Sequence, residues 1–156
     1  MKIRIISVGR TEDDYVRIGS ARFLKRIRVY HPVEEVRVKG ARAGKSEAIV
    51  RILDREGERI LKQIGPGDKV VLLDGEGQGM SSEVFAAFLG RELISGQGKP
   101  TFVIGGAEGV SQAVRERADR ILSLSPMTLP HELARLVLLE QLYRVFTILK
   151  GKRYHR

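Results

Sequence analysis

The chain contains no cysteine and only three histidines among its 156 residues. Without cysteine it can form no disulfide, no thiolate zinc site and no cysteine nucleophile. The three histidines, His31, His131 and His155, do not stand at the spacings of metal ligands. The acidic residues also lack the clustering that magnesium–phosphate chemistry requires. We therefore expect a protein that works without a metal.

Long apolar runs and targeting segments are missing too. No stretch is apolar for long enough to cross a bilayer, and Met1 leads directly into an alternating, strand-like run. We therefore expect a cytoplasmic protein with no membrane association. A hydrophobic content of 42% is enough for a full core. At this length, residues 1–156 are predicted to form a single domain.

Positive charge, by contrast, is abundant, with a formal net charge of +9 at pH 7. A surplus of this size favours a polyanionic partner, although a generally basic enzyme would show it too. Nucleic acid is favoured over a membrane because no basic amphipathic helix stands apart from the fold. The helix expected at residues 11–29 has a basic outer face that either is solvated or contacts phosphates: Arg17, Arg22, Lys25, Arg26 and Arg28.

Strand-like and helical patterns alternate along the whole chain. Strands are predicted at residues 2–8, 32–38, 70–73, 102–104 and 121–124. Helices are predicted between and after them, starting at caps or openers that are typical of helix ends: Thr11, Ser81 or Ser82, Ser111 and Pro130. The order predicts an α/β fold in three layers with a mainly parallel sheet. Residues 74–79, rich in glycine, are predicted to form a flexible loop.

Two helices carry further predictions. The helix expected to reach residue 64 should bury one apolar face: Ile49, Ile52, Leu53, Ile60 and Leu61. The last helix, from residue 130, is apolar around most of its circumference, and its polar strip is narrow: Glu140, Gln141 and Arg144. A surface helix in a monomer normally shows one apolar stripe. We therefore predict a homodimer that forms through the last helix.

Two irregular loops follow strands near the carboxyl end, at residues 105–109 and 123–130. Loops at the carboxyl ends of parallel strands are where α/β proteins bind ligands. Adjacent glycines, Gly105 and Gly106, let the backbone approach a flat ligand closely, although they can equally make a tight turn. The second loop is stiffened by two prolines and can read the edge of a base through its main chain. Apolar contacts from Leu73, Ile104 and Met127 would suit an adenine-containing cofactor.

Two other nucleotide-binding motifs fit poorly. A P-loop is suggested by Gly44, Lys45 and Ser46, but Lys39 stands where the motif needs its first glycine. A small NTPase would show nucleotide binding that depends on Lys45. The segment at 105–109 has the spacing G-G-x-x-G, which lacks the gap of a dinucleotide-binding fingerprint. Both motifs are therefore disfavoured.

Three segments together resemble one known family: FVIGGAEG at 102–109, SLSPMTLPHELARLVLLEQLYR at 123–144 and YHR at 154–156. They resemble the ribosomal large-subunit pseudouridine methyltransferase H family, which belongs to the SPOUT class of trefoil-knotted methyltransferases. The similarity extends over the whole chain and includes the MKIRIISVG start, the GKS-type basic loop and ILDREGE at 52–58. Ala107 stands where the family commonly has proline.

The resemblance implies an α/β fold with a deep C-terminal knot, a homodimer, and S-adenosylmethionine bound in the knot. It also implies a substrate, the pseudouridine in the helix-69 loop of 23S rRNA, methylated on ring nitrogen 3 in the assembled ribosome. By motif match, the cofactor-binding positions are Leu73, Gly105, Gly106, Ser123, Leu124, Ser125, Pro126, Met127 and Thr128. The alternative is a non-catalytic, basic RNA-binding factor that resembles the family.

The chemistry requires a proton to leave the imide nitrogen before that nitrogen can attack a methyl group. His155 is the right kind of base for this step. Stabilisation of the resulting anion would come from Arg144, Arg153 or Arg156, which could equally hold phosphates. Tyr154 could stack on a base. In an unrelated protein the same terminal residues would be a frayed tail, and His131 is expected to have a structural capping role.

Overall fold

The computed structural model describes residues 1–42, 44 and 46–155, and for His155 the backbone alone. Lys45 and Arg156, both named above, lie outside the described residues. The elements in chain order are β1 (Ile3–Val8), α1 (Asp14–Ile27), β2 (Val33–Val38), α2 (Ile49–Leu61), β3 (Lys69–Gly79), α3 (Ser82–Ser95), β4 (Pro100–Ile104), α4 (Gln112–Arg117), β5 (Arg120–Ser123), α5 (His131–Leu149) and a 3-10 turn, η1 (Arg153–His155).

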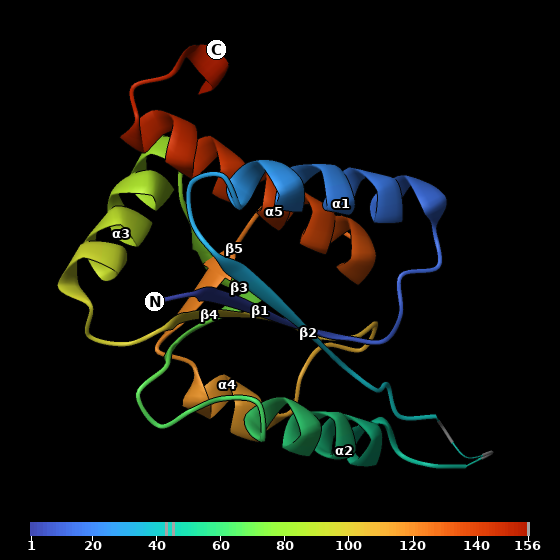
Figure 1. The fold of residues 1–156 in the computed structure, drawn as a ribbon. Helices are drawn as coiled ribbons and strands as arrows, with labels where there is room; N and C mark the ends of the chain where they lie inside the picture. Colours follow the sequence, from blue (N-terminus) through green and yellow to red (C-terminus); the bar gives the residue numbers. More distant parts are fainter. Residues whose placement is uncertain (43, 45, 156) are drawn as a thin grey trace.

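The five strands form one sheet in the order β2-β1-β4-β3-β5, and every neighbouring pair is parallel. Helices α1, α3 and α5 cover one face of this sheet, and α2 and α4 cover the other (Figure 1). The predicted three-layer α/β fold with a mainly parallel sheet is therefore confirmed. The trefoil knot stays a prediction.

The core lies in two layers, one on each face of the sheet. Because successive strand residues point to opposite faces, Ile5 and Ile6 of β1 are both fully buried but belong to different layers. Ile5 packs in the layer under α1, α3 and α5, around Phe102 and Leu138. Ile6 packs in the smaller layer under α2 and α4. Burial on both faces explains the continuous apolar runs of the central strands.

Strand β3 is longer than predicted, because it continues through the glycine-rich segment at 74–79. It pairs with β5 twice, with a register shift between Leu73 and Gln78. At this shift a Cβ on Gly77 would lie 2.7 Å from the carbonyl carbon of Ile121, so only glycine allows the two strands to approach here. The prediction of a flexible loop was wrong.

Two other local predictions were wrong. Helix α1 begins at Asp14 with Asp13 as its N-cap, so Thr11 does not cap it. The Thr11 hydroxyl instead accepts a hydrogen bond from the guanidinium of Arg37 on β2. In α2, Ile49 is 52% exposed rather than turned inward. The caps predicted for α3 and α4 are confirmed: Ser81 accepts from the Val84 N–H and Ser111 from the Val114 N–H.

Helix α5 is covered largely by its own chain. It packs against both α1 and α3, and Leu138, Leu139 and Leu142 are fully buried. One buried cation interrupts this apolar packing, because Arg135 is only 5% exposed. Its guanidinium donates to the Glu35 carboxylate of β2 and, at 2.8 Å, to Ser20 Oγ of α1. The homodimer therefore stays a prediction, since much of the apolar circumference already has a partner within the chain.

Candidate functional site

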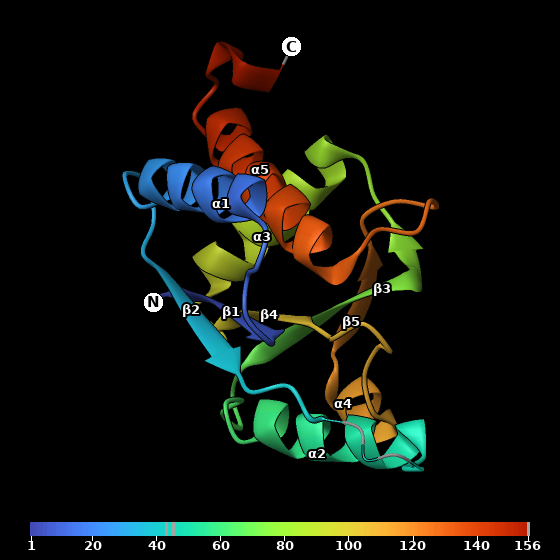
Figure 2. The ribbon, with the colours of Figure 1, turned by 90° about the vertical axis from the view of Figure 1, so that its right-hand side faces the viewer.

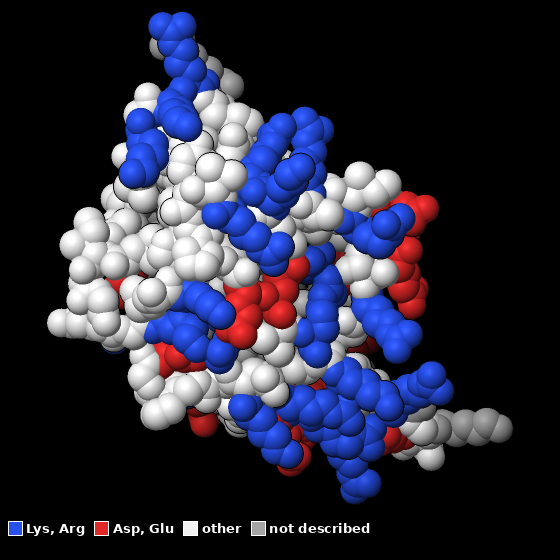
Figure 3. Space-filling view, viewed as in Figure 1, with Lys and Arg blue, Asp and Glu red and all other residues white. Residues whose placement is uncertain are grey.

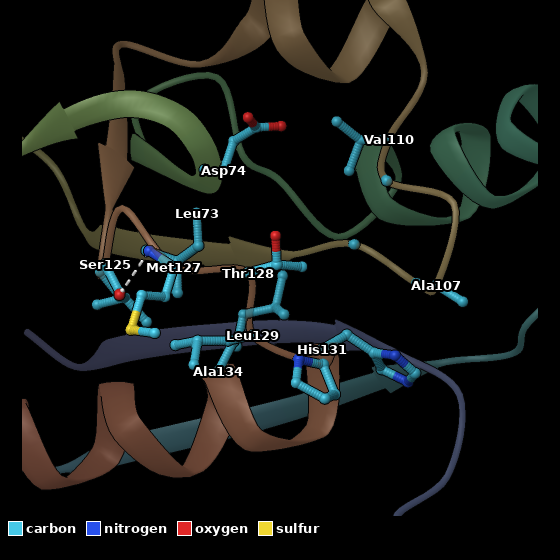
Figure 4. A pocket seen from close by; sticks show the side chains of 17 residues that line it. Leu73, Asp74, Ala107, Val110, Ser125, Met127, Thr128, Leu129, His131 and Ala134 are labelled. Atoms are coloured by element: carbon cyan, nitrogen blue, oxygen red, sulfur yellow. Dashed lines mark hydrogen bonds between the residues drawn. The ribbon is translucent and has the colours of Figure 1, made fainter.

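The carboxyl ends of the three adjacent strands β3, β4 and β5 bring the two irregular loops together. Leu73 on β3 pairs with Ile104 on β4 and with Leu122 on β5. The loops that follow β4 and β5 leave from this common edge and enclose a cavity of about 590 Å³ (Figure 4). The expectation that both loops contribute to one slot is confirmed.

Most of the predicted cofactor-binding residues line this cavity. Leu73, Gly105, Gly106, Leu124, Ser125, Met127 and Thr128 are among its walls. Ser123 and Pro126 are not, and they border two neighbouring depressions instead. Leu73, Ile104 and Met127, which are expected to supply apolar contacts, all lie at the cavity wall. Whether these residues bind a cofactor stays a prediction.

The glycine loop at 105–109 is closed by its own backbone. The Gly109 N–H donates to the Gly106 carbonyl at 3.1 Å. A Cβ on Gly105 would lie 2.5 Å from the Gly109 carbonyl oxygen, well inside van der Waals contact, so the loop can close this tightly only on a glycine. The result is a tight loop in which Gly105, Gly106 and Gly109 line the cavity without side chains of their own.

The second loop is braced by its hydroxyl side chains. Ser123 Oγ donates to the Ser125 carbonyl oxygen at 2.9 Å, and the Met127 N–H donates to Ser125 Oγ, also at 2.9 Å (Figure 4). Ser123 thus supports the loop from behind rather than from the cavity wall. Met127 is 77% exposed, which leaves its thioether side chain free to move against a ligand.

Sequence reasoning missed several residues of the cavity. Asp74 and Gly75 follow Leu73 directly and line it, as do Val110 and Leu129. The Asp74 carboxylate accepts a hydrogen bond from Arg115 at 2.6 Å. The available signal is their position immediately after predicted site residues. For Asp74 this signal is weakened by the glycines at 74–79, which indicate a flexible loop.

His131 was also misassigned. The N-cap of α5 is Pro130, and the imidazole of His131 in the first turn lines the cavity (Figure 4). The structural capping role expected for it was wrong. The signal that could have placed it is its position directly after the loop at 123–130, at the start of the helix that this loop feeds.

The C-terminal tail folds back onto α5. The Arg144 guanidinium lies 4.9 Å from the ring centroid of Tyr154, and the Tyr154 hydroxyl donates to Glu140 Oε1 at 3.2 Å. Burial, followed by the charge of Glu140, raises the pKa of Tyr154. The Glu140 carboxylate also pairs with Arg144. Residues 153–155 therefore form a 3-10 turn that packs on α5.

The tail and the cavity lie at opposite ends of α5 (Figure 2). His131 and Ala134, at the start of the helix, line the cavity, whereas η1 packs near its end. From His131 to Arg144 the helix rises by about 20 Å. Within one chain, Arg144 and Tyr154 are therefore not brought to the cavity, although the sequence predicted that they act there. The side chain of His155 and all of Arg156 lie outside the described residues.

Over the described ranges 1–42, 44 and 46–155, no three histidine, aspartate or glutamate side chains gather in a way that could hold a metal ion. Nor does any helix in this part of the chain combine the length and the hydropathy that are needed to cross a bilayer.

Comparison with known proteins assigns the chain to a family. The sequence model of a family described as "Predicted SPOUT methyltransferase" matches residues 1–155. The chain belongs to the SPOUT methyltransferase family. The family resemblance drawn from the sequence is therefore confirmed, and the chain is a methyltransferase by membership.

Curated relatives of this SPOUT methyltransferase carry a more specific name. A protein of Syntrophotalea carbinolica called "Ribosomal RNA large subunit methyltransferase H" is 46% identical over 155 residues, which cover 99% of each chain. A protein of the same name from Carboxydothermus hydrogenoformans is 42% identical over the full length of both chains.

Two solved structures share the fold of this SPOUT methyltransferase at low identity. A probable methyltransferase from Bordetella pertussis superimposes with a TM-score of 0.57 at 15% identity, covering 93% of this chain and 96% of that one. A tRNA methyltransferase from Aquifex aeolicus gives 0.55 at 14% identity, covering 93% of this chain and 70% of that one. At such identities the likeness concerns the fold alone.

Proposed function

We propose that this SPOUT methyltransferase transfers a methyl group from S-adenosylmethionine to ring nitrogen 3 of the pseudouridine in the helix-69 loop of 23S rRNA. It acts on the assembled ribosome, in the cytoplasm, as a homodimer and without a metal. The observation that carries the proposal is the single cavity that the two loops at 105–109 and 123–130 enclose, lined by apolar side chains and by the glycine loop. Full-length relatives named for methylation of large-subunit ribosomal RNA support the choice of substrate.

The residues of the cavity fit the proposed cofactor. A volume of about 590 Å³ lies within the range of small-molecule sites, roughly 300–1,000 Å³. Apolar side chains such as Leu73 and Ile104 would contact an adenine ring, and peptide groups of the glycine loop would meet its edges. The bound cofactor would supply a methyl group carried on a positively charged sulfur.

The chain's own residues must carry out the other steps of the reaction. They must place the uracil-type ring in line with the methyl group, since positioning supplies much of the rate in such a displacement. They must also remove the imide proton and stabilise the anion that forms. We assign proton removal to His155, charge stabilisation to Arg144 and Arg156, and stacking on the base to Tyr154. The Glu140 carboxylate raises the pKa of the Arg144 guanidinium, so that side chain stays cationic.

These tail residues can serve a cavity only if two chains combine. Because the tail lies at the far end of α5 from the cavity of its own chain, we infer that the tail of one subunit reaches the cavity of the other. Mixing two defective variants tests this inference. One carries Gly106→Val, whose side chain would press on Glu56 and Val8 and so distort the glycine loop of the cavity, and the other lacks residues 153–156. Heterodimers should recover activity, with one intact site each. If the activity of the mixture does not exceed that of either variant alone, the tail of one subunit does not serve the cavity of the other.

The activity itself is tested by incubating ribosomes with labelled cofactor and mapping the modified nucleotide. We expect label on nitrogen 3 of one pseudouridine in the helix-69 loop, and label elsewhere would refute the assignment.

Calorimetric titration with S-adenosylmethionine separates the enzyme from a non-catalytic RNA-binding factor, which would not bind it. Single-turnover rates at pH 7 test the base. If His155→Ala and His155→Gln remain near wild type, His155 is not the base.

A further inference from the structure

A second cavity, of about 420 Å³, opens where β2 leads into α2. Its six lining residues include four cations: Lys39, Gly40, Ala41, Arg42, Arg55 and Arg59. Figure 3 shows lysine and arginine side chains gathered over the α2 side of the molecule. A concave surface with this composition is typical of an anion-binding site, because low-dielectric walls focus the field of like charges.

Two of the arginines are held in place by the loop they line. Arg59 Nη1 donates to the Lys39 carbonyl oxygen at 2.6 Å, and Arg55 Nη2 donates to the Arg42 carbonyl oxygen at 3.1 Å. Both guanidinium groups are therefore positioned before any ligand arrives.

The charge of this cavity is only partly compensated. Arg55 forms an ion pair with Glu47 at 2.8 Å, which offsets its charge. Lys39 and Arg42 are exposed, and within the described residues neither side chain has an acidic partner. The cavity thus keeps an excess of positive charge that an anion would neutralise.

The basic cavity and the glycine loop of the first cavity both lie next to the carboxylate of Glu56. Glu56 on α2 is buried, with 8% exposure, and its Oε1 accepts the N–H of Ala41 at 2.9 Å. A Cβ on Gly106 would lie 3.3 Å from Oε2 of the same carboxylate. The Glu56 carboxylate therefore lies next to both the loop of the basic cavity and the glycine loop of the first cavity.

We propose that the basic cavity binds backbone phosphates of the RNA whose base enters the first cavity, with Lys39, Arg42 and Arg59 as the phosphate contacts. This rests on the proposed function, because the first cavity must hold a nucleotide base. Arginine suits the role because its planar donors match phosphate oxygens. Contact with a nucleotide backbone also explains why cations gather beside a site whose own lining is mostly neutral.

The basic outer face of α1 is the competing surface, and it is less suitable. It lies on the opposite side of the sheet from α2 (Figure 1). Arg17 is already paired with Asp14 at 2.9 Å, and Arg26 lies over the ring of Tyr143. We assign that face to solvent rather than to the phosphates next to the target base.

The test compares two double variants that remove the same charge. Lys39→Ala with Arg42→Ala alters the basic cavity, and Arg22→Ala with Lys25→Ala alters exposed residues of α1. Binding of each to assembled ribosomes is measured by sedimentation over a series of salt concentrations. Two lost phosphate contacts should reduce the slope of log K against log salt by about 1.4–1.8 and weaken binding roughly 10- to 30-fold near 0.15 M salt. The α1 variant should behave as wild type.

Three further results test whether the basic cavity binds phosphate. Lys39→Arg with Arg42→Lys should restore the wild-type slope, because it retains both charges. An equal or larger loss in the α1 variant would overturn the proposal. So would a loss of S-adenosylmethionine affinity in the Lys39→Ala, Arg42→Ala variant, since the cavity would then act on the cofactor loop and not on phosphate. If the wild-type chain fails to bind S-adenosylmethionine, the proposed function falls, while the salt dependence still tests the phosphate site separately.

Discussion

Replacing Gly105 by alanine tests the closed shape of the glycine loop. The added Cβ would lie 2.5 Å from the Gly109 carbonyl oxygen and 2.8 Å from Val110 Cγ1. Both contacts are too short, and the first is with backbone, which cannot turn away as a side chain can. Overpacking of this kind costs about 1–3 kcal/mol.

That cost should appear as a loss of folding stability, as a loss of cofactor affinity, or as both. If the loop keeps its shape in Gly105→Ala, the free energy of unfolding drops by about 1–3 kcal/mol and cofactor affinity is retained. If the loop opens to relieve the contact, stability is retained and the affinity for S-adenosylmethionine falls about 5- to 150-fold, since tenfold corresponds to about 1.4 kcal/mol. The two losses together should account for the cost.

Urea unfolding and calorimetric titration on the same preparation measure the two parts. Gly67→Ala is the matched control, because a Cβ there meets no atom within 4 Å, and it should leave both quantities unchanged. Wild-type stability together with wild-type affinity in Gly105→Ala would refute the reasoning, since the Cβ would then have been accommodated without cost.

Further predictions concern stability. Burial, and then the N-terminal ammonium, lower the pKa of His31 below its usual value of 6.5. The folded state then binds fewer protons than the unfolded state, so the contribution of His31 is present above about pH 6.5 and is lost as the pH falls through the folded pKa. His31→Phe, which preserves stacking on Phe146, should lose less stability than wild type between pH 7.5 and 5.5 in urea titrations, and equal losses would contradict this. Arg135→Met leaves the Glu35 carboxylate without its partner and should cost about 3 kcal/mol by urea unfolding; a change below about 1 kcal/mol would show that the pair is not coupled to folding. Ser81→Ala removes the cap of α3 and should lower the unfolding free energy by about 1 kcal/mol, with no loss expected for Ser81→Asp.

The sequence was sufficient for the elements and for the place of the cavity, because both follow from local patterns. Apolar runs such as that of β4 mark buried parallel strands, and irregular loops that follow such strands must meet at one edge of the sheet. Two boundaries were misjudged for local reasons as well. Three acidic residues follow Thr11, as in a typical helix start, but the first turn forms only at Asp14. The glycines at 74–79 indicate a loop, yet Gly77 is needed for the approach of β3 to β5.

Other features could not be predicted, because they depend on contacts between distant parts of the chain. The pair of Arg135 and Glu35 joins residues 100 positions apart. Glu56 lies in a helix of ordinary appearance, and nothing local shows that its carboxylate contacts two loops. The direction of the tail is a third case, since a short basic and aromatic terminus does not reveal that Tyr154 folds back onto Glu140.

The distance between the tail and its own cavity has a consequence for gene dosage. If each catalytic unit is assembled from two chains, as proposed above, the specific activity should fall on dilution even when both substrates are saturating. A truncated copy expressed beside the normal one would form mixed pairs with one working site each, because every intact tail still completes one cavity. The number of working sites should then follow the number of intact chains, so the truncated copy should not lower the output of a cell that also carries an intact gene.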